Sequence, residues 1–164
     1  MPEIICNTSP IQYLHQLGLL HVLPALARPV TVPPAVIEEL HIGRKLGLNL
    51  PDLAAIEWIT TRRPVSFAAL PLVSDLGPGE AEVLALALET KDAIPVLDDA
   101  LARQVAETLR LPVTGTLGLL LDAKRLSLIP AVRPLLEQLD ALGFRLAPHT
   151  RAAVLKLAGE PGGV

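Results

Sequence analysis

The amino-acid sequence predicts an α/β protein in which helices cover a central parallel sheet. Short apolar runs alternate along the chain with stretches whose apolar residues recur at helical spacing. Many of the 16 prolines and 11 glycines stand between these stretches, where they would end strands and helices. Strands that alternate with helices in this way are typical of βαβ units, whose strands pair in parallel.

In the first half of the chain, the expected elements begin at small polar residues or at proline. Ser9 and Pro10 follow a short apolar strand and are typical of a helix N-cap and first helical position. Leucines at helical spacing continue to Pro24, and Gly18 is expected to separate two short helices. The other elements expected here are strands at 3–6, 29–32 and 56–61, a helix at 35–42 and an exposed loop at 43–51.

In the second half, a stretch without a clear period, residues 64–76, leads to Gly77-Pro78-Gly79, which is expected to start a helix. This helix is apolar almost all round, so we expect it to be buried between neighbours. The expected elements are helices at 80–90, 100–109, 117–126, 130–142 and 150–158 and strands at 94–97 and 112–113. We expect a single domain over residues 1–158 and a frayed tail over residues 159–164.

The composition excludes several classes of protein. With 51% hydrophobic residues, the chain is expected to fold rather than stay disordered. It has no uninterrupted apolar run of about 18 residues, so no membrane span is expected. The start, MPEIIC, lacks a secretory pattern, and the lone Cys6 suits a reducing cytosol and is expected in the core. The expected location is therefore cytoplasmic.

The net charge of −3 argues against sequence-blind coating of DNA. Local basic pairs could still line a groove for nucleic acid, or they could simply be solvated faces. These pairs are Arg44-Lys45, Arg62-Arg63 and Lys124-Arg125. The four histidines show no zinc-type spacing, and we expect them at or near the surface.

The most informative stretch is Ile94–Leu97, an apolar run that stops at two adjacent acids, Asp98 and Asp99, before a helix. In open α/β proteins, active-site crevices lie at the carboxyl ends of parallel strands. Two acids at that edge would attract a divalent cation. The alternative is that one of them only caps the following helix.

Helical geometry adds two further acids. In the helix expected at 35–42, Glu39 lies beside the apolar stripe, whereas Glu38 points away from it. Glu80 lies on an apolar face of its helix, while Glu82 and Glu89 are expected to face water. A carboxylate on an apolar face needs a partner, a metal or a raised pKa, unless it only interacts with the helix dipole in the first turn.

A parallel sheet would bring Asn7, Thr114 and Thr116 to the same edge as the two aspartates, with Glu39 and Glu80 at its flanks. Oxygen ligands without His or Cys suit Mg²⁺ or Mn²⁺, which serve phosphoryl chemistry. The sequence has no glycine-rich nucleotide-binding loop of the common types and no nucleophile elbow.

Five stretches together resemble the PIN-domain family, in particular a PIN-like subfamily related to the nuclease toxins of prokaryotic toxin–antitoxin pairs. They are NTSPI, VPPAVIEEL, LGPGEAEVLALALE, VLDDALARQVA and TGTLGLLLDAKRLSLI, and they cover the chain to about Ala158. The resemblance implies a three-layer α/β/α sandwich and a metal-dependent ribonuclease. It also implies an RNA substrate, a homodimer and a protein antitoxin.

The resemblance carries over residue by residue. It matches Glu39, Glu80, Asp98 and Asp99 to the acidic catalytic and metal-binding positions of the family, and Thr114 and Thr116 to polar positions near the metal. Asn7 stands where the family pattern has its first acid, and its neutral amide should weaken the metal site. The alternative function is therefore a catalytically impaired PIN fold that acts by binding RNA or protein.

Three further polar residues are expected near this site or beside it. Ser9 and Arg103 are expected to support it; Arg103 could orient an acid, contact a phosphate or form an ion pair with Asp99 four residues earlier. Lys124 is expected to be a solvated helix residue.

Overall fold

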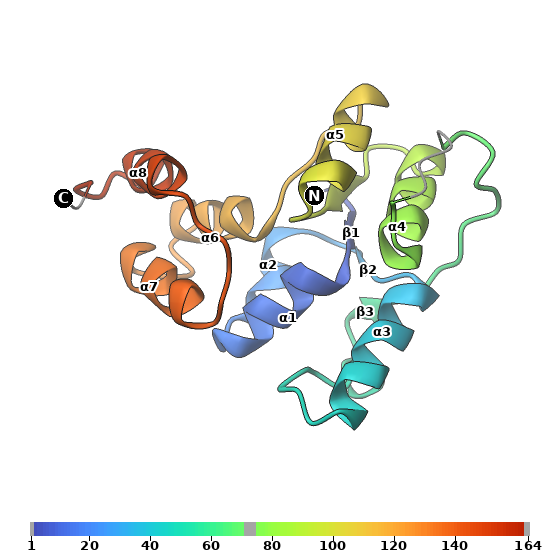
Figure 1. Cartoon of the computed structure of the whole chain (residues 1–164), viewed down its shortest axis with the longest axis horizontal. Coiled ribbons are helices and arrows are strands. Elements are labelled where there is room, and N and C mark those ends of the chain that lie inside the picture. Colours follow the sequence, from blue (N-terminus) through green and yellow to red (C-terminus); the bar gives the residue numbers. More distant parts are fainter. Residues whose placement is uncertain (1, 71–74, 163–164) are drawn as a thin grey trace. The chain divides into compact units, whose positions relative to one another are not determined.

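Four parallel strands form one sheet in the computed structural model, which describes residues 2–70 and 75–162 (Figure 1). The strands are β1 (Ile4–Cys6), β2 (Val30–Thr31), β3 (Ile59–Thr60) and β4 (Ile94–Val96), and their order is β3-β2-β1-β4. In the central strand, Ile5 pairs with Thr31 of β2 and with Pro95 of β4. The predicted α/β class, with a parallel sheet covered by helices, is confirmed.

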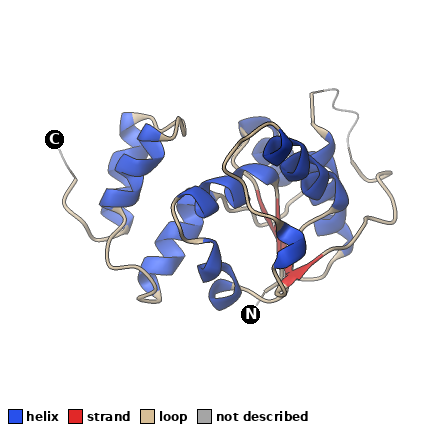
Figure 2. Ribbon diagram, turned by 90° about the horizontal axis from the view of Figure 1, so that it is seen from below, coloured by secondary structure: helices blue, strands red, loops and turns tan. Residues whose placement is uncertain are grey.

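The chain divides into two compact units, Met1–Thr116 and Leu117–Val164. In the first unit the strands lie among helices, as Figure 2 shows in red and blue. Its helices are α1 (Thr8–Gln16), η1 (Leu20–Val22), α2 (Leu23–Leu26), α3 (Pro34–Lys45), η2 (Leu53–Ala55), α4 (Pro78–Glu89) and α5 (Ala100–Thr108). Helix α4 packs against β1 and β4, and α3 packs against α1 and α4.

The core of the first unit consists of aliphatic side chains from the strands and from the inward faces of the helices. Its largest fully buried members include Ile5, Ile11, Leu14, Leu84 and Leu86. Cys6 is also buried and unpaired, as expected from its place in an apolar strand.

The second unit is helical, with most of α6 (Thr116–Arg125) followed by α7 (Arg133–Ala141) and α8 (Pro148–Leu157). Leu120, Leu136, Leu139 and Leu155 form its buried centre. The prediction of a single domain over residues 1–158 is not tested by this division and stays a prediction.

Several boundaries differ from the sequence-based expectation. Helix α1 begins at Thr8 with Asn7 at the N-cap, rather than after Ser9. Helix α3 continues to Lys45, so the expected loop is shorter. Residues 112–113 do not form the expected strand; the next residue, Thr114, makes a single parallel bridge to Val96. Of the irregular stretch 64–76, residues 71–74 lie outside the described residues.

Two residues expected to face water make specific contacts instead. Glu82 is half-buried, and its Oε2 accepts a hydrogen bond of 2.7 Å from the N–H of Ala35, at the start of α3. Lys124 donates to the carbonyl oxygen of Ala158 at 2.6 Å and to Oε2 of Glu160 at 2.9 Å. Both expectations were wrong for the same reason. The position of a residue on a helix determines the direction of its side chain, but it does not determine which other segment of the chain packs on that side.

Glu160 lies within the predicted tail and is held by three groups. Besides Lys124, the N–H groups of Val132 and Arg133 donate to its carboxylate at 2.7 and 3.0 Å. Burial acts to raise the pKa of Glu160, but the hydrogen bonds from these N–H groups and the charge of Lys124 outweigh it, so the pKa is lowered. The carboxylate thus anchors the chain just beyond α8 to the start of α7.

No helix in the described part of the chain is both long and apolar enough to cross a lipid bilayer.

Candidate functional site

Asp98 is held at the carboxyl end of β4 by three hydrogen bonds. The N–H of Thr116 donates to Oδ1 at 2.8 Å, and the Thr116 hydroxyl donates to Oδ2 at 2.6 Å. Oδ2 also accepts from the Ser9 hydroxyl at 3.0 Å. Since Thr116 is fully buried, its two donors cannot swing away, and the carboxylate has a defined orientation at the sheet edge.

Asn7 follows β1, the neighbour of β4, and its N–H donates to the carbonyl oxygen of Val96 at 3.1 Å. The side chain is 3% exposed, and its Oδ1 has no hydrogen-bond partner among the described residues. A buried oxygen without a partner costs about 1–3 kcal/mol, so such atoms in native proteins call for an explanation. A cation bound at this oxygen would supply one.

Glu39 of α3 faces the same small space as Asn7. A Cβ atom built on Gly79 would lie 2.9 Å from Asn7 Oδ1 and 2.9 and 3.1 Å from the two Glu39 oxygens. The Thr8 hydroxyl donates a short hydrogen bond to Glu39 Oε2. Glu39 is half-buried and Glu38 is exposed, as their positions on the helix predicted.

Glu80 is half-buried in the first turn of α4. Its Oε2 lies 2.5 Å from the position of a Cβ atom built on Gly77, so the carboxylate folds back over the start of its own helix. Within the described ranges, no protein group donates a hydrogen bond to it. This location is compatible with both roles considered for Glu80, a metal ligand and an acid that only interacts favourably with the helix dipole.

Asp99 is exposed and caps α5. Its Oδ2 accepts a hydrogen bond of 2.9 Å from the N–H of Ala102. The two adjacent acids are therefore separated by the structure: Asp98 turns towards Ser9 and Thr116, and Asp99 turns towards the helix. The helix-cap alternative describes Asp99 and not Asp98.

Arg103 does not form the expected ion pair with Asp99. Its Nη1 donates instead to the carbonyl oxygen of Leu97 at 2.9 Å, because the side chain runs back towards the end of β4. Thr114 contributes backbone hydrogen bonds, with its carbonyl oxygen accepting from the N–H of Leu97 at 2.8 Å.

The structure thus brings together Asn7 and Glu39 on one side and Asp98, Ser9 and Thr116 on the other, at the ends of two neighbouring strands. Across residues 2–70 and 75–162, no three His, Cys, Asp or Glu side chains gather closely enough to hold an ion by themselves. Sequence reasoning missed Thr8 and Gly79. Their signals were only that Thr8 follows Asn7 directly and that Gly79 stands in a Gly-Pro-Gly helix start.

Cys6 lies just before Asn7 in the chain and is fully buried in β1. Burial, together with the nearby charge of Asp98, raises the pKa of Cys6 from an ordinary 9.0 to about 12. Cys6 is therefore a protonated core thiol at neutral pH in this structure.

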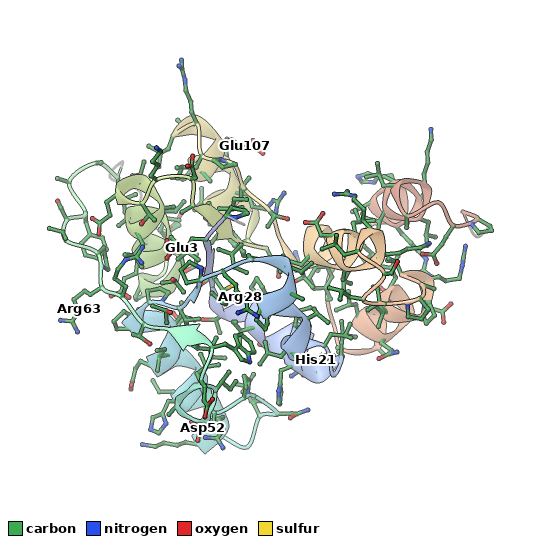
Figure 3. All side chains as sticks on the ribbon, turned by 180° about the vertical axis from the view of Figure 1, so that it is seen from behind. Glu3, His21, Arg28, Asp52, Arg63 and Glu107 are labelled. Atoms are coloured by element: carbon green, nitrogen blue, oxygen red, sulfur yellow. The ribbon has the colours of Figure 1, made fainter. Side chains whose placement is uncertain are left out.

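Among the basic pairs that could have lined a groove, Arg62 and Arg125 contact other residues of the protein. Arg62 donates to Glu3 Oε1 at 2.8 Å and to the Thr90 hydroxyl at 2.7 Å, whereas Arg63 is exposed and projects away from the ribbon (Figure 3). Arg125 pairs with Asp122 at 3.0 Å.

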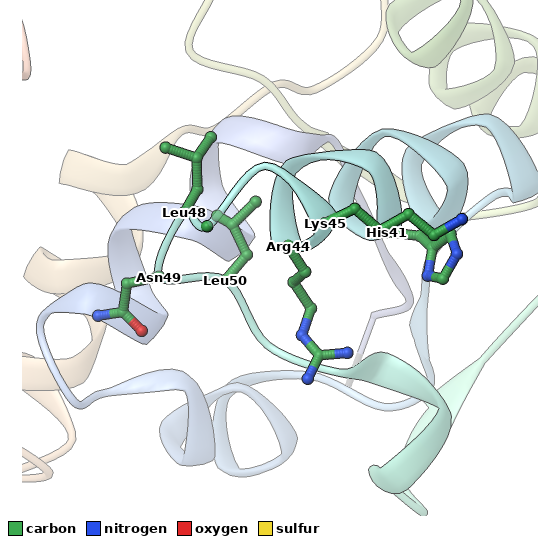
Figure 4. Close-up of a pocket in the computed structure, with 7 residues that line it drawn as sticks. His41, Arg44, Lys45, Leu48, Asn49 and Leu50 are labelled. Carbon is green, nitrogen blue, oxygen red and sulfur yellow. The ribbon is translucent and has the colours of Figure 1, made fainter.

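Arg44 and Lys45 line a separate pocket of about 480 Å³ at the end of α3, together with His41 and the loop from Gly47 to Leu50 (Figure 4). Glu39 and Arg44 are five residues apart, which at about 100° per residue places them about 140° apart around the helix. The pocket therefore opens on a different face of α3 from the one that carries Glu39.

A scan against models of protein families identifies the family of this chain. The family model described as a PIN domain matches residues 3–160, which is nearly the whole chain. A search of curated proteins finds no match. The family match includes both strand ends that carry Asn7 and Asp98 and the helices that carry Glu39 and Glu80. The chain therefore belongs to the PIN-domain family.

Proposed function

We propose that this protein is a divalent-metal-dependent ribonuclease whose ion is held by Asn7, Glu39 and Asp98. PIN domains have a nuclease-type fold, bind RNA and generally depend on divalent metals. The observation that carries the proposal for this chain is the buried Oδ1 of Asn7, which has no hydrogen-bond partner among residues 2–70 and 75–162 and faces the Glu39 carboxylate.

The residues present fit a hard cation. An amide oxygen and two carboxylates are ligands that Mg²⁺ and Mn²⁺ accept, and their combined charge of about −2 balances one divalent ion. Glu80 has no protein partner in the described structure and could add a further oxygen after a change of rotamer. The ion, when bound, would polarise the phosphodiester and make water a better nucleophile.

The protein's own contribution is to hold these oxygens in place. Thr116 and Ser9 fix the Asp98 carboxylate, and Thr8 holds Glu39. Because these donors are in place before any ligand arrives, the oxygens need little rearrangement on binding. Asp99 is not required in this proposal, since its carboxylate caps α5.

The test is cleavage of labelled single-stranded RNA by the purified protein with Mn²⁺ or Mg²⁺, beside a chelated control. We expect cleavage that the chelator abolishes and that Asp98→Asn removes, while a fold check by circular dichroism stays unchanged. Cleavage that persists with normal metal dependence in Asp98→Asn would contradict the proposed site.

One observation favours the second candidate function, a PIN fold that binds RNA or protein without cutting. Asn7 gives the site a neutral oxygen, so the site has one negative charge fewer than it would have with an aspartate at this position. Asn7→Asp distinguishes the two. If only this variant cleaves, the natural protein is a binding protein on a nuclease scaffold. The roles of toxin and homodimer, and a protein antitoxin as partner, stay predictions.

A further inference from the structure

Arg103 places a cation at the sheet edge that carries the acidic site. Its Nη1 donates to the carbonyl oxygen of Leu97, the residue between β4 and Asp98. A guanidinium has five N–H donors in a planar fork. One of them is used here, and in the described part of the chain no acid pairs with Arg103. A half-buried guanidinium with several open donors is therefore directed at this edge.

Gly115 keeps a space open between this guanidinium and the Asp98 carboxylate. A Cβ atom on Gly115 would lie 2.7 Å from Asp98 Oδ1 and 2.9 Å from Arg103 Nη1. Such distances are too short for a carbon atom, so any larger residue at this position would push one group away. Arg103 and Asp98 thus border one small volume without forming an ion pair.

The acids of the proposed metal site explain why a cation is needed at this edge of the sheet. Glu39, Asp98 and Glu80 are negative and would repel a polyanion that approaches the site. An approaching anion needs a positive group beside the acids. A planar guanidinium matches the paired oxygens of a phosphate better than any other side chain.

We propose that Arg103 binds a non-bridging oxygen of the RNA phosphodiester that lies next to Asp98. This inference rests on the proposed function and names the group that recognises the substrate. Arg103 is then a substrate-binding residue, and its hydrogen bond to Leu97 holds the fork in the binding position.

The test measures binding without turnover. Fluorescence anisotropy in Ca²⁺ gives the affinity of short single-stranded RNA for the parent protein, Arg103→Gln and Arg103→Lys. Arg63→Gln is the matched control, because it removes the same charge from an exposed arginine that makes no ion pair in the described structure. We expect Arg103→Gln to weaken binding about 10- to 100-fold, as for loss of a hydrogen bond to a charged group. Arg103→Lys, which keeps the charge but lacks the fork, should lie between.

A second arm locates the contact. A methylphosphonate, which removes the charge of one phosphate, is moved along the RNA one position at a time. At one position it should weaken binding to the parent but leave binding to Arg103→Gln unchanged. The inference is overturned if both proteins respond alike at every position, or if Arg103→Gln binds RNA as tightly as Arg63→Gln. Absence of cleavage with these binding results intact would contradict the ribonuclease proposal alone.

Discussion

Replacement of Gly79 by alanine tests whether the protein needs the space next to Asn7 and Glu39 for its stability and for metal binding. Gly79 lies in the first turn of α4, and no positive φ requires glycine there. In an ordinary helix, glycine to alanine stabilises by about 1 kcal/mol. Propensity alone therefore predicts that Gly79→Ala unfolds at a higher denaturant concentration than the parent.

The contacts reverse that sign. The new Cβ would lie 2.9 Å from Asn7 Oδ1 and 2.9 Å from a Glu39 oxygen, and Asn7 is 3% exposed. A buried side chain cannot move away without disturbing its neighbours, and overpacking of this kind costs about 1–3 kcal/mol. Because the Cβ meets three oxygen atoms at once, we take the upper part of this range, about 2–3 kcal/mol. Subtracting the helix gain of about 1 kcal/mol leaves a net destabilisation of about 1–2 kcal/mol, or a Tm lower by about 2–8 °C for a chain of this length.

The measurement is urea unfolding followed by circular dichroism, with Mn²⁺ titrated calorimetrically into the same proteins. Gly162→Ala is the control, because a Cβ there meets no atom of the described residues within 4 Å. In an Asn7→Ala background, which lacks the Oδ1 atom, Gly79→Ala should be less harmful than in the parent. A Gly79→Ala protein that is as stable as the parent and binds Mn²⁺ equally well would refute the reasoning.

Three further predictions concern single side chains. Thr116→Val removes the hydroxyl that donates to Asp98 and should cost about 1.5–3 kcal/mol in urea unfolding; a change below about 0.5 kcal/mol would show the bond to be unimportant. Asp99→Ala removes the cap of α5 and should cost about 0.5–2 kcal/mol but retain RNA cleavage; a stable, inactive variant would instead return Asp99 to the metal site. The folded-state pKa of Glu160 is lowered, so its carboxylate stabilises the fold above its ordinary pKa of 4.5, and this contribution is lost as the pH falls through the lowered value. Glu160→Gln, which weakens the contact with Lys124, should therefore lower stability at pH 7 and lose this difference at low pH; an equal deficit at both pH values would contradict the pKa direction.

The sequence by itself predicted the features that depend on local pattern. Alternation of apolar runs and helical periods gave the α/β class, because an element's period follows from its own backbone geometry. The stop of an apolar run at Asp98 placed an acid at the end of a parallel strand, which the structure confirms. The side of α3 on which Glu39 lies also followed from 100° per residue alone.

Other features depend on which distant segments meet, and these only the tertiary structure decided. Asp98 and Asp99 are equivalent in a linear reading, but Thr116 and Ser9 reach one and not the other. The burial of Asn7 Oδ1 depends on α4, whose Gly79 packs next to it. The role of Gly115 depends on the contact between Arg103 and Leu97, which places the guanidinium beside it. Lys124 and Glu160, read as a solvated residue and part of a frayed tail, contact each other across 36 positions. A helical or strand period states which way a side chain points, whereas the atoms it meets are set by the path of the whole chain.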